Sequence, residues 1–407
     1  MNSVLRYGTA ASISLEIPPE KLVAACGQPH AESLDDPAAA VAAALIDPLE
    51  FPPLAQAIVP GDRVVVAVQP GVPQSPAIIG GTIQLICEAG ADPGNVVLLL
   101  GAEDASSDDD EICAELPADL ASLIKIVIHD PNDDQQLAYL AMDSKGNPVY
   151  VNRELQDADF VVPIGRLRVD SASGYYGTLG GLFPVFGDQA AQERFRSPRN
   201  ELIAAGRQRR RAEVEEVGWL LGVIFSIQVV PGAGGTVLHV LAGSVPAVAQ
   251  QGNRLCQAAW VYQVPRRADL VIAGVEGDPG SQTWENVGRA AAAALEVTGG
   301  GGAIAICTEL AAPPGDALRQ LANGSEYEAI RHALQKETSV DALPALQLLQ
   351  AMDQTQVYLL SRLDDDLVED LGMAPVGGVD EVLRLGRNHD SCIVLANAQD
   401  AVASPQA

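Results

Sequence analysis

Runs of apolar, β-branched residues alternate along the chain with stretches of helical periodicity. DRVVVAV (62–68) is an apolar run bounded by PG and QPG, which is typical of a buried strand. PAIIGGTIQLICEAGA then has apolar residues at helical spacing, and NVVLLLGAED predicts a second strand that ends in a loop. IKIVIHDPND, PVYVNRELQDADFVVPIG and the segment 221–230 continue the pattern. The order strand, helix, strand indicates a parallel sheet with right-handed crossovers.

A second cycle begins after VPRR (264–267). ADLVIAGVEG predicts a strand, TWENVGRAAAAALEV a helix, and AIAICTEL, VYLLSRL and SCIVLANA later strands. Four glycines (299–302) separate the helix from the next strand, and we interpret them as a helix C-terminal turn, because a dinucleotide-binding glycine motif has the opposite order. We therefore predict two α/β domains with mostly parallel sheets, residues 1–265 and 266–407, and an interdomain cleft.

Ligands of parallel sheets bind at the carboxyl ends of strands, which here points to the loops that start at Gln69, Gly101 and Gly165. The segment SASGYYGTLGGLFPVFG (171–187) follows the last of these and has five glycines but no lysine, histidine or acid. Such a composition lets backbone pass close to a ligand. Its two tyrosines could stack on a ligand or donate to an anion, or one could pack under the loop while the other covers it. Of Arg166 and Arg168, just before this segment, we expect only one to face the cleft, or else either to pair with surface acids.

The charge and composition of the chain exclude several classes of binding partner. Lys+Arg number 25 and Asp+Glu 53, so the net charge is 25 − 53 = −28, and such a surface repels nucleic acid and anionic lipid. The basic run 207–211 lies among acids, and we interpret it as a solvated helix face. Six cysteines without a CxxC spacing indicate buried thiols in a reducing compartment. No signal-peptide core or membrane-length apolar stretch is visible. We expect a soluble, cytoplasmic protein and leave a homo-oligomer open.

The order of several segments resembles the nickel-dependent lactate racemase family. The resemblance covers nearly the whole chain and includes PPLAQAIVPGDRVVVAV, LLLGAED, VIHDP, GNPVYVNRELQDADFVVPIGRL, GYYGTLGGLFP, VLAGSVPAVAQQG, GGGGAIAICTEL and VYLLSRLDDDLVEDLGMAPV. It implies two α/β domains and a nickel-pincer nucleotide tethered through a lysine. Histidines complete the metal shell and act as acid and base on a 2-hydroxy acid in that family.

This chain departs from the family at the residues that carry this chemistry. The family's tether loop, GFSGGRKSIVPG, fits GYYGTLGGLFPV without a gap and places Gly180 at the lysine, with Gly177 and Gly181 as neighbouring cofactor-loop positions. The family's GRIEPHFFAG fits GRLRVDSASG, so Asp170 stands at one catalytic histidine. AEDASSDDDE offers Asp104 at the other. A glycine cannot form the tether, which puts the cofactor in doubt, and we predict no metal ligands.

The family's QxxK pair falls on Asn286 and Arg289, counted back from the glycines at 301 and 302. The two residues lie one helical turn apart on one face, where an amide and a guanidinium could hold a carboxylate. We add Tyr176 as a further substrate-binding residue.

Three hypotheses of different classes follow. In the first, the protein has lost the tethered nickel chemistry and binds a small anionic, hydroxy-acid-like metabolite in the cleft through Asn286 and Arg289. In the second, it is an active 2-hydroxy-acid racemase or epimerase that holds the cofactor non-covalently and uses Asp104 and Asp170 as acid and base. The alternative for these two carboxylates is a solvated acidic loop and a turn cap. In the third, the acidic face is a scaffold for a protein partner.

Overall fold

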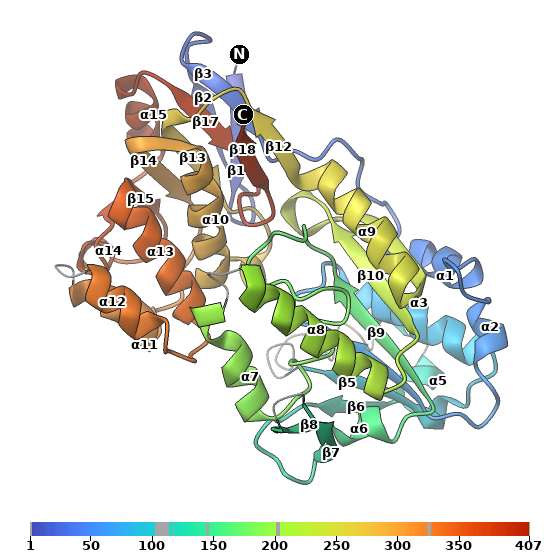
Figure 1. Ribbon diagram of the computed structural model, residues 1–407. Coiled ribbons are helices and arrows are strands. Elements are labelled where there is room, and N and C mark those ends of the chain that lie inside the picture. Colours follow the sequence, from blue (N-terminus) through green and yellow to red (C-terminus); the bar gives the residue numbers. More distant parts are fainter. Residues whose placement is uncertain are drawn as a thin grey trace.

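Two six-stranded sheets form the centre of the protein in a computed structural model (Figure 1). The structure describes residues 2–101, 114–116, 118–143, 146–200, 204–323 and 327–406. The first sheet has the order β11-β10-β9-β4-β5-β6, and all its neighbours are parallel except β10 and β11. Its strands are β4 (Val64–Val68), β5 (Val96–Leu100), β6 (Lys125–Ile128), β9 (Phe160–Arg166), β10 (Phe225–Pro231) and β11 (Val237–Ser244).

The second sheet is parallel throughout, in the order β16-β15-β14-β13-β17-β3. The mostly parallel α/β architecture that we predicted is therefore confirmed. The sheets divide the chain differently from the predicted ranges 1–265 and 266–407, because an N-terminal strand pairs with a strand near the C-terminus. The strands are β3 (Leu22–Cys26), β13 (Ala268–Gly274), β14 (Thr298–Cys307), β15 (Gln356–Leu360), β16 (Ala374–Pro375) and β17 (Cys392–Leu395).

Helices cover the faces of both sheets (Figure 1). The first sheet packs against α1 (Pro37–Ile46) and α3 (Ser75–Glu88) on one face and carries α7 (Gln189–Arg196) and α8 (Ala204–Leu220) on the other. The second carries α10 (Trp284–Val297) and α13 (Ala342–Gln354) on one face and α15 (Val379–Asn388), β1 (Asn2–Tyr7) and β2 (Ala11–Glu16) on the other. The other α-helices and strands of the described residues are α2 (Leu54–Ala57), α5 (Ala118–Ala121), β7 (Leu137–Met142), β8 (Pro148–Asn152), α6 (Arg153–Gln156), α9 (Val245–Trp260), β12 (Val261–Val264), α11 (Asp316–Arg319), α12 (Tyr327–Leu334), α14 (Asp365–Asp370) and β18 (Val402–Pro405).

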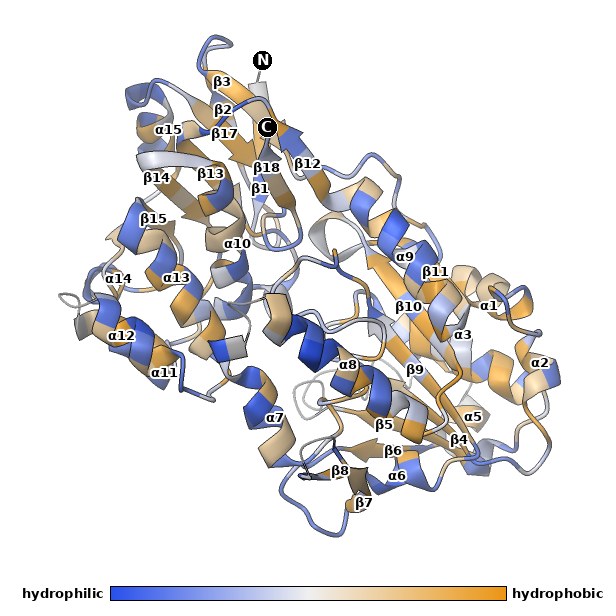
Figure 2. Cartoon of the chain, in the orientation of Figure 1, coloured by the Kyte–Doolittle hydropathy of each residue, from blue (hydrophilic) through white to orange (hydrophobic). Residues whose placement is uncertain are grey.

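Burial on both faces explains the continuous apolar runs of the central strands. In β4, Val64 and Val66 belong to the core beside α1 and α3, whereas Val65 and Ala67 belong to the core beneath α7 and α8. Successive side chains of a strand point to opposite faces, so a strand covered on both sides must be apolar at every position. Figure 2 shows this as hydrophobic strands between helices of mixed colour.

The four glycines after α10 are not a helix C-terminal turn, so that prediction was wrong. The helix ends at Val297, and the glycines are part of β14. Ala268 of β13 pairs with Thr298 and Leu270 with Ala303, so all four glycines lie opposite a single residue as an irregularity of the ladder.

Across the part of the chain that the structure describes, no helix has both the length and the apolar character needed to cross a membrane.

Candidate functional site

The loops after β4 and β9 meet at the carboxyl edge of the first sheet. Gln69 follows β4, and its backbone N–H donates to the carbonyl of Ile164 in β9 (2.9 Å). Its side-chain Oε1 accepts from the backbone N–H of Arg166 (2.9 Å). Two of the three loops that we singled out therefore lie together; residues 102–113, which follow Gly101, lie outside the described residues.

The glycine-rich segment 171–187 is partly a core element. Leu179, Leu182 and Phe183 are buried in the core beneath α7 and α8. Gly181 lies against Gln69, and a Cβ added at this glycine would be 2.7 Å from the Gln69 Cβ. The segment is therefore fixed on the sheet by its own apolar side chains and by a close approach that only glycine allows.

The other two predicted cofactor-loop glycines also face protein. Gly177 has a φ of +93°, a left-handed conformation that favours glycine. A Cβ at Gly180 would lie 3.1 Å from the carbonyl oxygen of Gly177 and 3.4 Å from the Cβ of Tyr176. The position that the resemblance assigns to the tether thus points at the loop's own backbone.

Tyr176, predicted to bind substrate, uses its hydroxyl within the protein. The hydroxyl donates to the backbone carbonyl of Phe195 (3.1 Å) and accepts from Nη1 of Arg210 (2.9 Å). Arg210 is 4% exposed and also donates to the carbonyls of Arg194 and Ser197. The prediction that the basic run 207–211 is a solvated helix face was therefore wrong for Arg210, which holds α8 to α7 and to the glycine-rich segment.

The two candidate acid and base residues are not brought together by the described structure. Asp170 follows β9, is 44% exposed at its side chain and lies 3.4 Å from Nη1 of Arg211. Nη2 of Arg211 also donates to the backbone carbonyl of Asp170 (3.2 Å). Asp104 lies outside the described residues. The surroundings of Asp170 are those of an ion-paired turn residue at the surface.

Asn286 and Arg289 lie on one face at the start of α10, as their spacing predicted. Thr283 caps the N-terminus of this helix, and its hydroxyl accepts from the backbone N–H of Asn286 (3.2 Å). The Asn286 amide donates to the carbonyl of Ser281 (2.8 Å), so this nitrogen already has a partner. Arg289 donates through Nη2 to Oε1 of Glu285 (2.7 Å) and through Nη1 to the carbonyl of Ser173 in the glycine-rich segment (2.8 Å).

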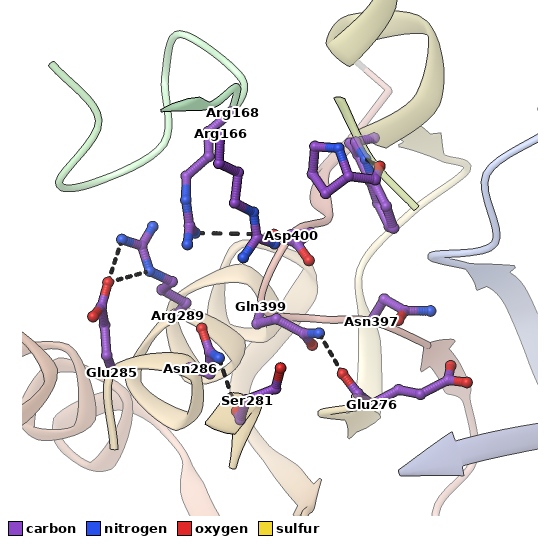
Figure 3. Close-up of polar contacts among 12 residues, drawn as sticks. Arg166, Arg168, Glu276, Ser281, Glu285, Asn286, Arg289, Asn397, Gln399 and Asp400 are labelled. Carbon is purple, nitrogen blue, oxygen red and sulfur yellow. Dashed lines mark hydrogen bonds and ion pairs between the residues drawn. The ribbon is translucent and has the colours of Figure 1, made fainter. Parts of the chain in front are cut away.

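Beside Arg289 lie two more arginines and one carboxylate, the arrangement that Figure 3 shows. We call Arg166, Arg168 and Arg289 the arginine cluster. Nη2 of Arg166 donates to Oδ1 of Asp400, and Nη1 of Arg168 lies 3.9 Å from the same oxygen. Asp400 belongs to the turn between β17 and β18 and is 5% exposed. The expectation that only one of the two strand-end arginines faces this region was wrong, because residues two apart on an extended chain share a face.

Arg168 has the least satisfied charge of the cluster. It is 16% exposed at its side chain and makes no hydrogen bond to a described residue. Burial, and then the neighbouring charges of Arg289 and Arg166, lower its pKa to about 9. Nε of Arg166 is also buried without a hydrogen-bond partner among the described residues. Such unpaired donors are costly in a protein interior, so the cluster is suited to receive oxygen atoms of an anion.

Glu285 partly neutralises the positive charge of the arginine cluster through its ion pair with Arg289. The charge of Arg289 holds its pKa down, to about 2. Its side chain is 57% exposed, whereas that of Arg289 is 10% exposed. Near neutral pH the cluster therefore consists of three guanidinium groups and the two carboxylates of Asp400 and Glu285.

The residues present do not fit a lysine-tethered nickel cofactor. Gly180 offers no side-chain nitrogen, and its Cβ position faces Gly177 and Tyr176. Among the described residues, no three His, Cys, Asp or Glu side chains gather where they could hold a metal ion. His129 is buried and forms hydrogen bonds with the Gly187 carbonyl (2.9 Å) and the Asn152 amide (3.0 Å), which are contacts within the scaffold.

Comparison with known protein families gives a match for the N-terminal part of the chain. Residues 7–192 match the family model described as the lactate racemase N-terminal domain. This segment belongs to the lactate racemase family. The racemase fold extends over the whole chain: the lactate racemase apoprotein from Thermoanaerobacterium thermosaccharolyticum aligns with 99% of this chain and 100% of its own, at 18% identity and a TM-score of 0.80.

A second solved structure that is similar to this chain is a protein from Thermotoga maritima, determined by the Northeast Structural Genomics Consortium. It covers 92% of this chain and 100% of its own, at 12% identity and a TM-score of 0.64. None of the curated protein sequences matches the chain. At these identities the structural likeness shows the fold alone, so the chemistry of the site must be argued from this chain's own residues.

Proposed function

We propose that this racemase-fold protein binds a small carboxylate anion of the hydroxy-acid class at the arginine cluster, without tethered nickel-pincer chemistry. The observation that carries the proposal is Arg168. Its guanidinium is largely buried, lacks a hydrogen bond to any described residue, and lies near the charges of Arg166 and Arg289. An anion supplies the acceptors and the negative charge that this arrangement lacks.

The net charge of the protein also supports an anion site at the arginine cluster. A chain with a net charge of −28 repels anions over most of its surface. Three arginines collected beside only two carboxylates are therefore a local exception, and such an exception costs stability unless a ligand uses it.

The predicted anchors take different parts in this proposal. Arg289 contributes charge, which its partner Glu285 neutralises in part from the exposed side of the cluster. Asn286 positions the start of α10 through its bond to Ser281. Arg168, which the sequence did not single out as an anchor, supplies the free donors.

The racemase alternative has less support. It requires Asp170 as an acid or base, and that carboxylate lies against Arg211 at the surface. Isotope exchange at the carbon that bears the hydroxyl group, compared between wild type and Asp170→Asn, tests it: exchange in wild type that the variant loses would establish a racemase and overturn our proposal. A cytoplasmic location and the absence of nucleic-acid and membrane partners stay predictions.

Intact mass spectrometry with metal analysis tests the claim about the tether. The protein is made in cells that synthesise the nickel-pincer nucleotide. We expect the mass of the unmodified chain and no stoichiometric nickel, because Gly180 cannot form the covalent link. An added mass together with one nickel ion per chain would refute the proposal.

A further inference from the structure

We propose that Asp400, aided by Glu285, holds the arginine cluster at one excess positive charge and thereby selects singly charged over doubly charged anions. This inference rests on the proposed function, since it assigns the charge of the ligand that the cluster takes. No sequence motif pointed to Asp400, and the ion pair with Arg166 joins positions that are 234 residues apart.

The position of Asp400 is fixed by a buried turn. Its backbone N–H donates to the carbonyl of Asn397 (2.9 Å). Asn397 is fully buried and has a φ of +43°. Its amide nitrogen donates to the carbonyl of Gly27 (3.1 Å), and its side-chain oxygen accepts from the backbone N–H of Gly234 (3.0 Å). A carboxylate on such a support cannot easily withdraw from an incoming anion.

The sum of the charges at the site favours a ligand with a single negative charge. The three guanidinium groups contribute three positive charges, and Asp400 and Glu285 contribute two negative ones, which leaves 3 − 2 = 1. A ligand with one carboxylate neutralises this excess. A second negative charge on the ligand would have no unpaired cation left and would be repelled by the fixed carboxylate.

Distances indicate that the repulsion is appreciable. Oδ1 of Asp400 lies 3.9 Å from Nη1 of Arg168. An anion that accepts from this Nη1 at about 2.9 Å is therefore within about 7 Å of the Asp400 carboxylate. At this separation, in a largely buried site, one extra unit of charge changes affinity by about tenfold or more.

The test compares two 2-hydroxy acids that differ by one carboxylate. Calorimetric titration with lactate and with malate is carried out on wild type, on Asp400→Asn and on Glu285→Gln. We expect lactate to bind wild type more tightly than malate. The ratio of malate affinity to lactate affinity should rise about tenfold in Asp400→Asn and in the same direction, by less, in Glu285→Gln.

The control and the opposing outcomes separate this inference from the function on which it rests. Asp353→Asn removes a carboxylate that pairs with Arg331 elsewhere on the second half and should leave the ratio unchanged. If lactate binds wild type but the ratio stays the same in both charge variants, the role of Asp400 and Glu285 is refuted while the proposed function stands. If wild type binds neither acid, the proposed function fails and this inference fails with it. Glu285 is exposed, so its variant still decides the question if Asp400→Asn does not fold.

Discussion

Replacing Arg168 by methionine should make the ligand-free protein more stable, although it removes a side chain from a largely buried site. Methionine keeps an unbranched apolar stem of similar course, so most packing is retained. What is lost is a guanidinium without a hydrogen bond to a described residue and with only a distant approach to Asp400, at 3.9 Å.

The magnitude follows from the pKa of Arg168. Burial and the charges of Arg289 and Arg166 lower this pKa to about 9. A base whose pKa is lower in the folded than in the unfolded protein destabilises the fold fully at every pH below its folded pKa, hence near neutrality. Each pKa unit corresponds to about 1.4 kcal/mol, and the exposed 16% of the side chain screens part of the effect. We expect Arg168→Met to raise the free energy of unfolding by about 2 kcal/mol.

The matched variant Arg166→Met should instead lower the free energy of unfolding. Arg166 donates to Asp400, which is 5% exposed, and its removal leaves a buried carboxylate without its hydrogen-bonded partner. Breaking such a pair costs about 3 kcal/mol. Urea unfolding near pH 7, followed by circular dichroism, measures both variants. If Arg168→Met is destabilised like Arg166→Met, Arg168 is a structural ion-pair residue and the proposed anion-receiving site is refuted.

Three further predictions concern the scaffold. Gly181→Ala brings a Cβ to 2.7 Å from the Cβ of Gln69, so unfolding free energy should fall by about 1–3 kcal/mol; full stability in urea would contradict the described packing. Arg210→Met removes the donor to three partly buried acceptors and should cost about 3 kcal/mol in the same assay; a change within about ±0.5 kcal/mol, as is usual at the surface, would restore the solvated-face interpretation. Burial lowers the pKa of His129, so folding stability should fall as pH drops below the ordinary histidine pKa. His129→Gln should weaken this loss between about pH 7 and pH 5, and an unchanged pH dependence would show that His129 does not cause it.

Much of the architecture could be predicted because the central strands are buried on both faces. Apolar runs such as 64–68 have no polar position that would interrupt the strand pattern. Their order with the intervening helices predicts parallel pairing. The position of β3 could not be predicted, since its pairing with β17 joins opposite ends of the chain. The glycines at 299–302 were misinterpreted because their bulge is set by the register with β13 and not by local preference.

Within the site, positions could be predicted reliably only where spacing along one element decides them. Asn286 and Arg289 share a face of α10 as the helical period requires. The contact of Asp400 with Arg166 and Arg168 depends on how the two halves of the chain pack, and no local pattern reports it. Arg210 likewise looked solvated because its burial comes from α7 and the glycine-rich segment.

Titration of the wild-type protein and of Arg168→Met with lactate tests the proposed anion site most directly. We predict saturable binding to wild type that weakens at high salt, and its loss in Arg168→Met while that variant stays folded. Asp353→Asn should bind as wild type does. Equal lactate binding by wild type and Arg168→Met, or none by wild type, would contradict the proposed function.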